Sequence, residues 1–440
     1  MAGVEVALTL LPGDPEALLL RADALLAQDN PLAALSAFHA ILDRATDPQV
    51  TTAAQLGIAR ALEARHELAG ALAALDGLED TAADAVRRRL ARRQRGEPVV
   101  VVRPMTDLVM HDTLERAASA PYHAGYFAVT VGAVRRSPDQ PGWGEHLLAA
   151  SLEFTQVLGG LRHQEGDPLF ALRFITRPDP RLPERGSLTI ALLVRVSAPD
   201  EDACRALALD LWNTLRGILP LAHEFVYGFE PVVDEAALTA LLEPFEPATV
   251  AEVVRREDVP QENNSRYAVY PFSPASRDLH NLCWTLLRQP APAMLSVHLL
   301  PTDVMPWETA ALARVALDEP HPASEEVGTL SVQDPLWAWW HGPRLWSQTQ
   351  TSRRLVETLR AQAYILGITV MGSAGTSPLL PEMVAAGLFG PFHDDGDGTR
   401  GGYEVVRAAP GEELAAARRN VTQLDVERWV YTGAPGGAAR

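Results

Sequence analysis

The chain contains no lysine, and all 38 of its basic residues are arginine. A Walker-type phosphate loop uses a lysine to reach the β- and γ-phosphates. A pyridoxal phosphate enzyme needs a lysine amine for its Schiff base, and arginine cannot replace it because arginine is never neutral in proteins. The sequence therefore excludes both kinds of site within this chain.

Cysteine is almost absent. Cys204 and Cys283 are the only two thiols, which is too few for a thiolate-rich zinc site. Cys204 lies in a helical pattern and Cys283 in an apolar stretch. We expect both to be buried small side chains rather than partners in a disulfide.

Basic charge is scarce as well, because the 38 arginines are opposed by 56 acidic residues for a net charge of −18. A surface this acidic repels polyphosphate, whereas nucleic-acid-binding proteins usually carry a basic stripe. Direct binding of DNA or RNA is therefore not expected.

The usual motifs of metal binding and covalent catalysis are also missing. The 12 histidines form neither a His-x3-His nor a His-Glu-x-x-His pair. The glycine-rich residues 372–377 have the spacing of neither a phosphate loop nor a Gly-x-Ser-x-Gly nucleophile elbow, and they are interpreted as a strand-to-helix turn with a Ser or Thr cap. We expect no metal, no cofactor and no catalytic residues.

No apolar run approaches the roughly 20 residues that a membrane-spanning helix needs. Residues 1–11 lack the basic region and the cleavage site of a signal peptide. The sequence predicts a cytoplasmic protein that does not insert into membranes.

Residues 14–80 have the pattern of short amphipathic helices joined by turns. Ala33 and Ala69 fall at equivalent places 36 residues apart, close to the ~34-residue period of tetratricopeptide repeats. A capping helix is expected at residues 81–95. The characteristic Trp and Tyr residues of that repeat are absent, so an ordinary Ala- and Leu-rich helical bundle remains the alternative interpretation. The positions expected at the helix contacts include Leu20, Ala24, Ala33, Ala40, Leu56 and Gly57.

After Gly96 and Pro98 the pattern becomes mixed. Strands are predicted at residues 99–102, 126–134, 169–176, 188–197, 225–229, 293–300, 364–371 and 402–408. Helices are predicted at residues 143–158, 201–219, 234–242, 307–317, 345–363, 380–388 and 412–420. Paired strands among helices favour α+β layers over a doubly wound sheet. The predicted fold is α+β, with a tetratricopeptide-like helical domain (1–97) followed by tandem mixed α/β, ferredoxin-like domains (98–260 and 261–440).

Several sequence segments after residue 97 resemble segments of a known protein family. They are the strand at 188–197 with its following helix, residues 241–244 and 299–303, the helix 345–363 that leads into the strand 365–371, and residues 401–407. Through them residues 170–429 resemble the N-terminal, non-ATPase region of HerA-like and TraC-like DNA-translocating motors (FtsK–HerA superfamily). In that family a nucleotide-hydrolysing core follows. The resemblance implies that another polypeptide supplies that core here.

Four tryptophans lie within ten residues: Trp337, Trp339, Trp340 and Trp346, with Arg344 among them. Indoles and arginines are enriched at protein–protein contact sites. These five residues are the candidate partner-binding site. An aromatic core plug beneath the predicted helix 345–363 and stacking on nucleic-acid bases are the alternatives.

The leading hypothesis is a non-catalytic accessory or scaffold subunit that assembles with a protein partner, such as an ATPase motor lacking its own assembly region, or with further copies of itself. The second hypothesis is a stand-alone peptide-binding adaptor of the tetratricopeptide type. The third is an enzyme whose site no motif reveals.

Overall fold

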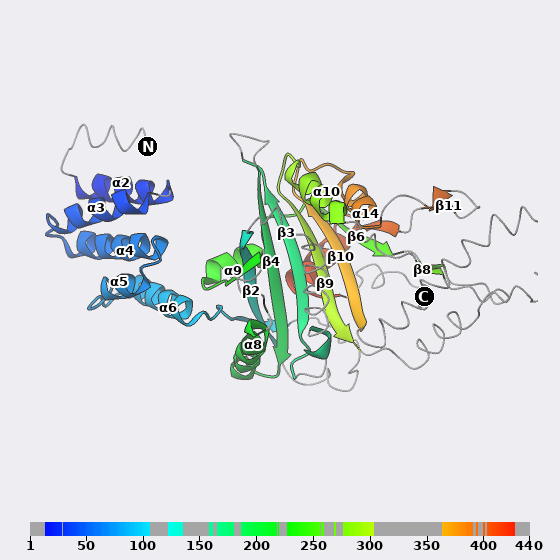
Figure 1. Cartoon of the computed structure of the whole chain (residues 1–440), viewed down its shortest axis with the longest axis horizontal. Coiled ribbons are helices and arrows are strands. Elements are labelled where there is room, and N and C mark those ends of the chain that lie inside the picture. The colour runs from blue at the N-terminus through cyan, green and yellow to red at the C-terminus, as the bar shows by residue number, and fades with distance from the viewer. Residues whose placement is uncertain are drawn as a thin grey trace, which may run out of the picture. The chain divides into compact units, whose positions relative to one another are not determined.

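The computed structural model divides into two compact units (Figure 1). The helical unit comprises Met1–Val99 with Pro231–Glu235, and the sheet unit comprises Val100–Glu230 with Ala236–Arg440. The structure describes residues 14–28, 30–105, 122–134, 158–161, 165–179, 186–217, 219, 227–255, 257–258, 268–269, 276–302, 363–389, 393–394, 399–400 and 403–426.

The helical unit contains five described helices. They are α2 (Pro15–Ala27), α3 (Pro31–Leu42), α4 (Pro48–Ala64), α5 (Leu68–Ala73) and α6 (Thr81–Arg95). Proline at the first position pre-sets the helical φ of α2, α3 and α4. The side chains of Asp14, Asn30, Asp47 and Asp80 precede four of these helices and accept hydrogen bonds from backbone N–H groups of the first turn.

The first core of this unit lies between α2, α3 and α4, where Phe38 packs against Gly57. A Cβ built on Gly57 would lie only 2.3–2.6 Å from atoms of the Phe38 ring, so glycine allows the two helices to approach. Two predicted contact positions are wrong, because Leu20 is 58% exposed and Ala40 is exposed as well. The helix contact uses Ala22, Ala34, Phe38 and Ile41 instead.

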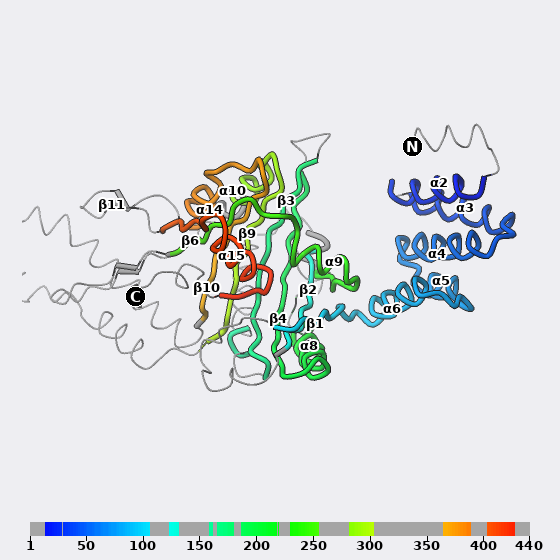
Figure 2. The backbone as a smooth tube through the Cα atoms, turned by 180° about the vertical axis from the view of Figure 1, so that it is seen from behind, coloured from blue at the N-terminus to red at the C-terminus, as the bar shows by residue number. Residues whose placement is uncertain are grey.

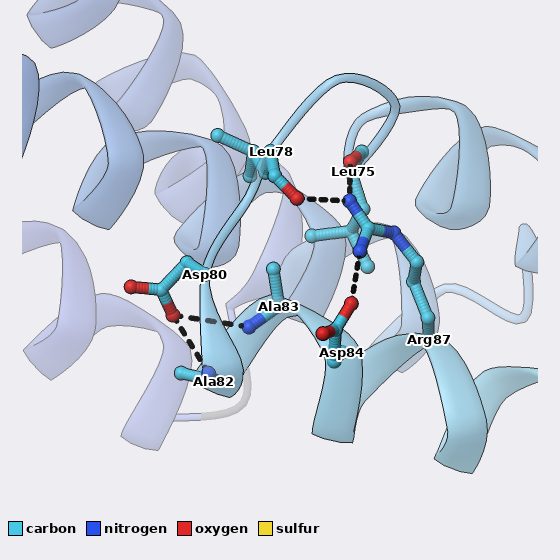
Figure 3. Close-up of polar contacts among 7 residues, drawn as sticks. All are labelled: Leu75, Leu78, Asp80, Ala82, Ala83, Asp84 and Arg87. Atoms are coloured by element: carbon cyan, nitrogen blue, oxygen red, sulfur yellow. Dashed lines mark hydrogen bonds and ion pairs between the residues drawn. The ribbon is translucent and has the colours of Figure 1, made fainter.

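Arg87 holds the turn between α5 and α6 (Figure 3). Its guanidinium donates hydrogen bonds to the carbonyl oxygens of Leu75 and Leu78, each at 2.5 Å, and pairs with Asp84. One side chain therefore binds two carbonyl groups of the turn, including that of Leu75, which also accepts from Leu78 N at 3.2 Å.

Glu63 of α4 is a buried carboxylate that pairs with two arginines of α6. Its oxygens lie 2.5 Å from Arg89 and 3.3 Å from Arg93. Arg89 also lies 3.6 Å from Asp234, and Val99 donates a backbone hydrogen bond to Val232 at 2.7 Å. These contacts explain why residues 231–235 belong to the helical unit.

The sheet unit is built on nine antiparallel strands among the described residues, in the order β1-β2-β4-β3-β9-β10-β6-β13 with β5 also paired to β2. The strands are β1 (Val101–Met105), β2 (Tyr122–Val134), β3 (Leu169–Arg177), β4 (Ser187–Ala198), β5 (Tyr227–Pro231), β6 (Thr249–Arg255), β9 (Ala293–Thr302), β10 (Ala363–Gly372) and β13 (Tyr403–Arg407). Two short ladders, β7 (Glu257–Asp258) with β8 (Ala268–Val269) and β11 (His393–Asp394) with β12 (Thr399–Arg400), lie apart from this sheet.

One face of the sheet is apolar and is covered by α8 (Glu201–Arg216), α10 (Ser276–Leu287) and α14 (Leu380–Phe389). The helix α8 begins at Asp200, which caps Ala203 N at 2.8 Å, and buries a stripe that includes Cys204 and Trp212. The Trp212 ring meets Phe127 of β2 edge-on at 6.2 Å. The helices α9 (Glu235–Leu242) and α15 (Glu412–Thr422) contribute carbonyl groups to the opposite face, where Figure 2 shows α15 in front of the strands.

The predicted fold class is confirmed in its main features, which are an N-terminal helical stretch and a mixed α+β part with a large antiparallel sheet. Strands from both predicted α/β segments join in this one sheet, because β3 pairs with β9. The boundary predicted at residue 260, the helix predicted at 307–317 and residues 345–362 of the next predicted helix lie outside the described residues, and Ala363 begins β10. No helix among the described ranges is both long and apolar enough to cross a membrane.

Candidate functional site: a buried polar cluster on the sheet

The face of the sheet opposite α8, α10 and α14 carries a set of buried polar side chains. In the strand register Arg173 lies opposite Ser296, Ser296 opposite Thr369, and Thr369 opposite Glu252. Because side chains alternate between faces along a strand, these four point to the same side. The polar cluster consists of this row with Tyr126, Arg195 and His298, each at most 9% exposed.

Arg173 is completely buried and is bound mainly by main-chain oxygens. It donates to the carbonyls of Leu241 at 2.6 Å and Leu242 at 2.8 Å at the end of α9, and to the carbonyl of Val421 in the last turn of α15. Burial lowers the pKa of the guanidinium to about 9, while Tyr126 and Glu243 act in the opposite direction. The arginine stays charged at neutral pH and holds the negative ends of two helices.

A directed chain of hydrogen bonds starts at Arg173. Its Nε donates to Ser296 Oγ at 3.3 Å, and Ser296 Oγ lies 2.8 Å from His298 Nε2. The Nδ1 atom of His298 lies 2.7 Å from the carbonyl oxygen of Asp425. A carbonyl can only accept, so Nδ1 carries the proton and Nε2 accepts from the serine hydroxyl.

His298 is therefore neutral. Burial and the nearby Arg173 guanidinium lower its pKa to about 3, Arg195 acts in the same direction, and the bond to the Asp425 carbonyl opposes them. The hydrogen-bond geometry and the charge environment require the same protonation state.

Arg195 extends the cluster to β4. It donates through Nη1 to the carbonyl of Gln423 at 3.0 Å. Its Nε is buried and has no hydrogen-bond partner. Tyr126 lies opposite Arg195 on β2, and burial raises the pKa of its phenol against the opposing influence of that guanidinium.

The Ser296–His298 pair has the spacing of a nucleophile and a general base. In this conformation Ser296 is 0% and His298 2% exposed, so a substrate cannot reach the hydroxyl. What the cluster does here is hold two helix ends on the sheet. Among the described residues no three His, Cys, Asp or Glu side chains gather in a way that could hold a metal ion.

The sequence analysis did not single out the polar cluster. A signal was present, because Arg173, Ser296 and His298 are isolated polar residues inside strongly apolar strand sequences. Lys and Arg are almost never fully buried unless they are paired, so an arginine in such a strand already indicates acceptors on a packed neighbour. Those acceptors are carbonyl oxygens, which have no signature in the sequence.

The predicted partner-binding residues Trp337, Trp339, Trp340, Arg344 and Trp346 lie outside the described residues, and their role stays a prediction. Cys204 is buried as expected, and Cys283 is half-buried; burial raises the pKa of both thiols.

The interpretation of residues 372–377 as a capped turn is confirmed. The Ser377 hydroxyl accepts from Leu379 N at 3.3 Å just before α14. A Cβ on Gly372 would lie 2.8 Å from the Thr376 Cβ, so the tight turn explains the glycine.

Comparison with known proteins adds no family to these observations, because neither the protein-family models nor the curated proteins contain a match to this chain.

Proposed function

We propose that the chain is a non-catalytic accessory or scaffold subunit that assembles with a protein partner. The observation that carries the proposal is that three apolar side chains on α10, on α14 and just before α14 are exposed, and these two helices pack side by side. Trp284 is 45%, Met383 46% and Leu379 61% exposed. Exposed apolar residues with a tryptophan among them are typical of contact sites between proteins. We call these three residues the α10/α14 surface.

A second contact site is proposed on the helical unit. Leu20 on α2 and Leu32 on α3 are 58% and 61% exposed, and we call them the α2/α3 surface. Units of successive packed helices commonly recruit partners through one face. The tetratricopeptide-like character of the unit is part of this proposal and is supported by the 36-residue offset between Ala33 and Ala69.

We propose that the chain is not catalytic because of the contacts that the polar cluster makes. The hydrogen bonds of Arg173, Arg195 and His298 end largely on carbonyl oxygens of the chain itself. Such contacts hold elements in place and leave the Ser296 hydroxyl enclosed.

The resemblance of residues 170–429 to HerA-like and TraC-like motor proteins favours an ATPase motor as the partner. In this arrangement the motor supplies the phosphate loop and the present chain supplies an assembly surface. The tryptophans at 337–346 are proposed as further contact residues, and additional copies of the chain are the alternative occupant.

The test uses the tagged full-length chain to capture partners from native lysate, followed by light scattering of the complex rebuilt from purified components. The two test variants replace Trp284 and Met383 by serine, or Leu20 and Leu32 by serine. The matched control replaces Ile365 and Leu366 by serine, which are exposed apolar residues of β10.

The scaffold proposal expects the α10/α14 variant to lose the rebuilt complex while the control keeps it. The adaptor alternative is favoured by the division of the chain into two units, and it expects the α2/α3 variant alone to lose the complex. A chain that stays monomeric and captures no partner, or one that hydrolyses ATP in pure form, contradicts the proposal.

A further inference from the structure

The helical unit is a run of packed helices with two different ends. Among the described helices, α2 packs mainly against α3 and α4, and α6 packs mainly against α4 and α5. Figures 1 and 2 show α2 and α6 at opposite ends of this run. One side of each end helix therefore points away from the rest of the unit.

The outer side of α2 is apolar at its centre and acidic on both flanks. Ala22 is buried on the inner side, whereas Leu20 is 58% exposed on the outer side. Glu16 and Asp23 are exposed and lie four residues before and three residues after Leu20, so the three side chains share one face. Asp23 forms only a long pair of 4.0 Å with Arg60, and both side chains are about half exposed. The end of a helical stack usually presents a polar surface, so an exposed leucine here indicates a face that a further helix covers.

The outer side of α6 is basic. Val86 lies buried on the inner side, and Arg88, Arg92 and Arg95 recur at spacings of four and three residues on the outer side. Arg88 forms no ion pair among the described residues, and Arg95 pairs with Glu97 at 2.7 Å. Six of the residues of α6 are arginine and one is aspartate, in a chain whose net charge is −18. This helix therefore offers a local cationic surface on an acidic protein.

The two outer sides match in charge and in spacing. Glu16 and Asp23 stand seven residues apart on α2. Arg88 and Arg95 stand seven residues apart on α6. Each pair spans about 10 Å along its helix, so two helices packed antiparallel bring both acids to both arginines at once. Glu16 then faces Arg95. Asp23 faces Arg88.

The same antiparallel alignment gives Leu20 a place to pack. Counted along the two helices, Leu20 falls opposite Ala91, a small half-buried residue beside the arginines. The aliphatic stems of those arginines can cover the leucine while their charged ends reach the carboxylates. A parallel alignment would instead set Leu20 opposite Arg92. The antiparallel arrangement also aligns the helix dipoles favourably.

We propose that α2 of one copy of the chain docks antiparallel on α6 of a second copy, through the acidic face around Leu20 and the arginine face of α6. The two faces are different surfaces, so the contact is head-to-tail and each copy keeps one face of each kind for a further neighbour. This inference rests on the proposed α2/α3 contact site and names the occupant of its α2 part.

Sedimentation velocity of the full-length chain over a concentration series tests the proposal. The average mass should rise with concentration. Raising the salt from about 0.1 M to about 1 M should weaken the association, because the Debye length falls from about 10 Å to about 3 Å.

Charge reversal identifies the two faces. The double variant Arg88→Glu with Arg95→Glu sets acids against acids, and it should raise the concentration needed for association by about tenfold, because two exposed ion pairs become two repulsions. The double variant Glu16→Arg with Asp23→Arg should have the same effect. All four substitutions in one chain exchange the charges of both faces and should restore association. Such a recovery cannot come from unfolding.

The matched control is Arg205→Glu with Arg418→Glu, two exposed arginines of the sheet unit. It changes the net charge as much as the α6 variant does, and it should leave association unchanged. Far-ultraviolet circular dichroism of every variant verifies that the helices are intact.

The proposal is overturned by a chain that stays monomeric over the whole series, or by a fourfold variant that associates no better than the two double variants. The scaffold proposal survives that result if the α10/α14 variant still loses its captured partner. Conversely, charge-dependent association of a chain that captures no other protein supports the head-to-tail contact and contradicts a motor partner.

Discussion

Arg173 stands between Leu172 and Phe174 in a strand that is otherwise apolar. Its three neighbouring carbonyls come from Leu241, Leu242 and Val421, and the Val421 carbonyl also accepts from Leu424 N at 3.2 Å. Burying a charge and three carbonyl groups is tolerated because they satisfy one another. Removing the guanidinium takes a donor away from the buried carbonyl groups, and removing the carbonyl groups leaves the buried charge unpaired.

The variant Arg173→Met should therefore destabilise the sheet unit. It fills similar volume but removes the donor to the buried carbonyls of Leu241 and Leu242, and a buried acceptor left unpaired costs about 1–3 kcal/mol. Urea unfolding followed by tryptophan fluorescence measures the change.

Arg205→Ala serves as the control, because Arg205 forms an exposed pair with Glu201 one turn apart on α8. Such pairs contribute about 0.3–0.5 kcal/mol. A loss for Arg173→Met no larger than that of the control would show that the buried bonds add little.

Individual residues also show which contacts can be predicted from the sequence and which cannot. Local caps and turns such as Asp80 and Ser377 are readable because donor and acceptor lie within three residues of each other. The partners of Arg173 lie 68 and 248 residues away along the chain, and they are main-chain atoms. Long-range recognition of this kind leaves no pattern in one sequence.

Among the elements, α6 is the one whose predicted bounds match the structure, at residues 81–95. It begins after the cap Asp80 and ends at Gly96, whose φ of 63° suits glycine. The strands β3, β4, β9 and β10 were predicted to within a few residues because they are long and apolar.

Two of the longer elements were missed, β6 and α10, as were the two-residue strands β7, β8, β11 and β12. The strand β6 contains Glu252, which interrupts the apolar pattern and lies buried opposite Thr369 in the sheet. The helix α10 was recognised only as an apolar stretch around Cys283.

Asp80→Ala tests the cap of α6. The carboxylate accepts from Ala82 N at 2.6 Å and Ala83 N at 3.3 Å (Figure 3). Loss of such a cap costs about 1 kcal/mol. Hydrogen exchange should show faster opening of the first turn of α6. Asp76→Ala, a nearby change outside the cap, should leave these amides unaffected.

Gly57→Ala tests the close approach of α3 and α4. A methyl group there meets the Phe38 ring at 2.3–2.6 Å, so the ring has to move. Overpacking of this kind costs about 1–3 kcal/mol, against a gain of about 1 kcal/mol in helix propensity. We expect a net loss of up to about 2 kcal/mol in the helical unit.

The matched control is Gly70→Ala in α5, where the new Cβ would lie 3.5 Å from Leu62, an ordinary contact. This change should stabilise the unit by about 0.5–1 kcal/mol. Equal effects of the two substitutions would show that Phe38 does not restrict position 57.

At the scale of the whole molecule, the division into two units has a thermodynamic consequence. The helical unit has its own buried clusters around Phe38 and Leu75, and the sheet unit has separate ones around Phe170 and Leu295. Each unit therefore encloses a core of its own, which is the condition for independent cooperative unfolding.

Calorimetry of the full-length chain should accordingly resolve two transitions. Gly57→Ala should lower the midpoint of one of them and Arg173→Met the midpoint of the other, because each substitution lies in a different core. Distant, independent sites are additive, so the double variant should show both shifts at their single-variant size. A single transition that both substitutions lower would show that the two units unfold as one.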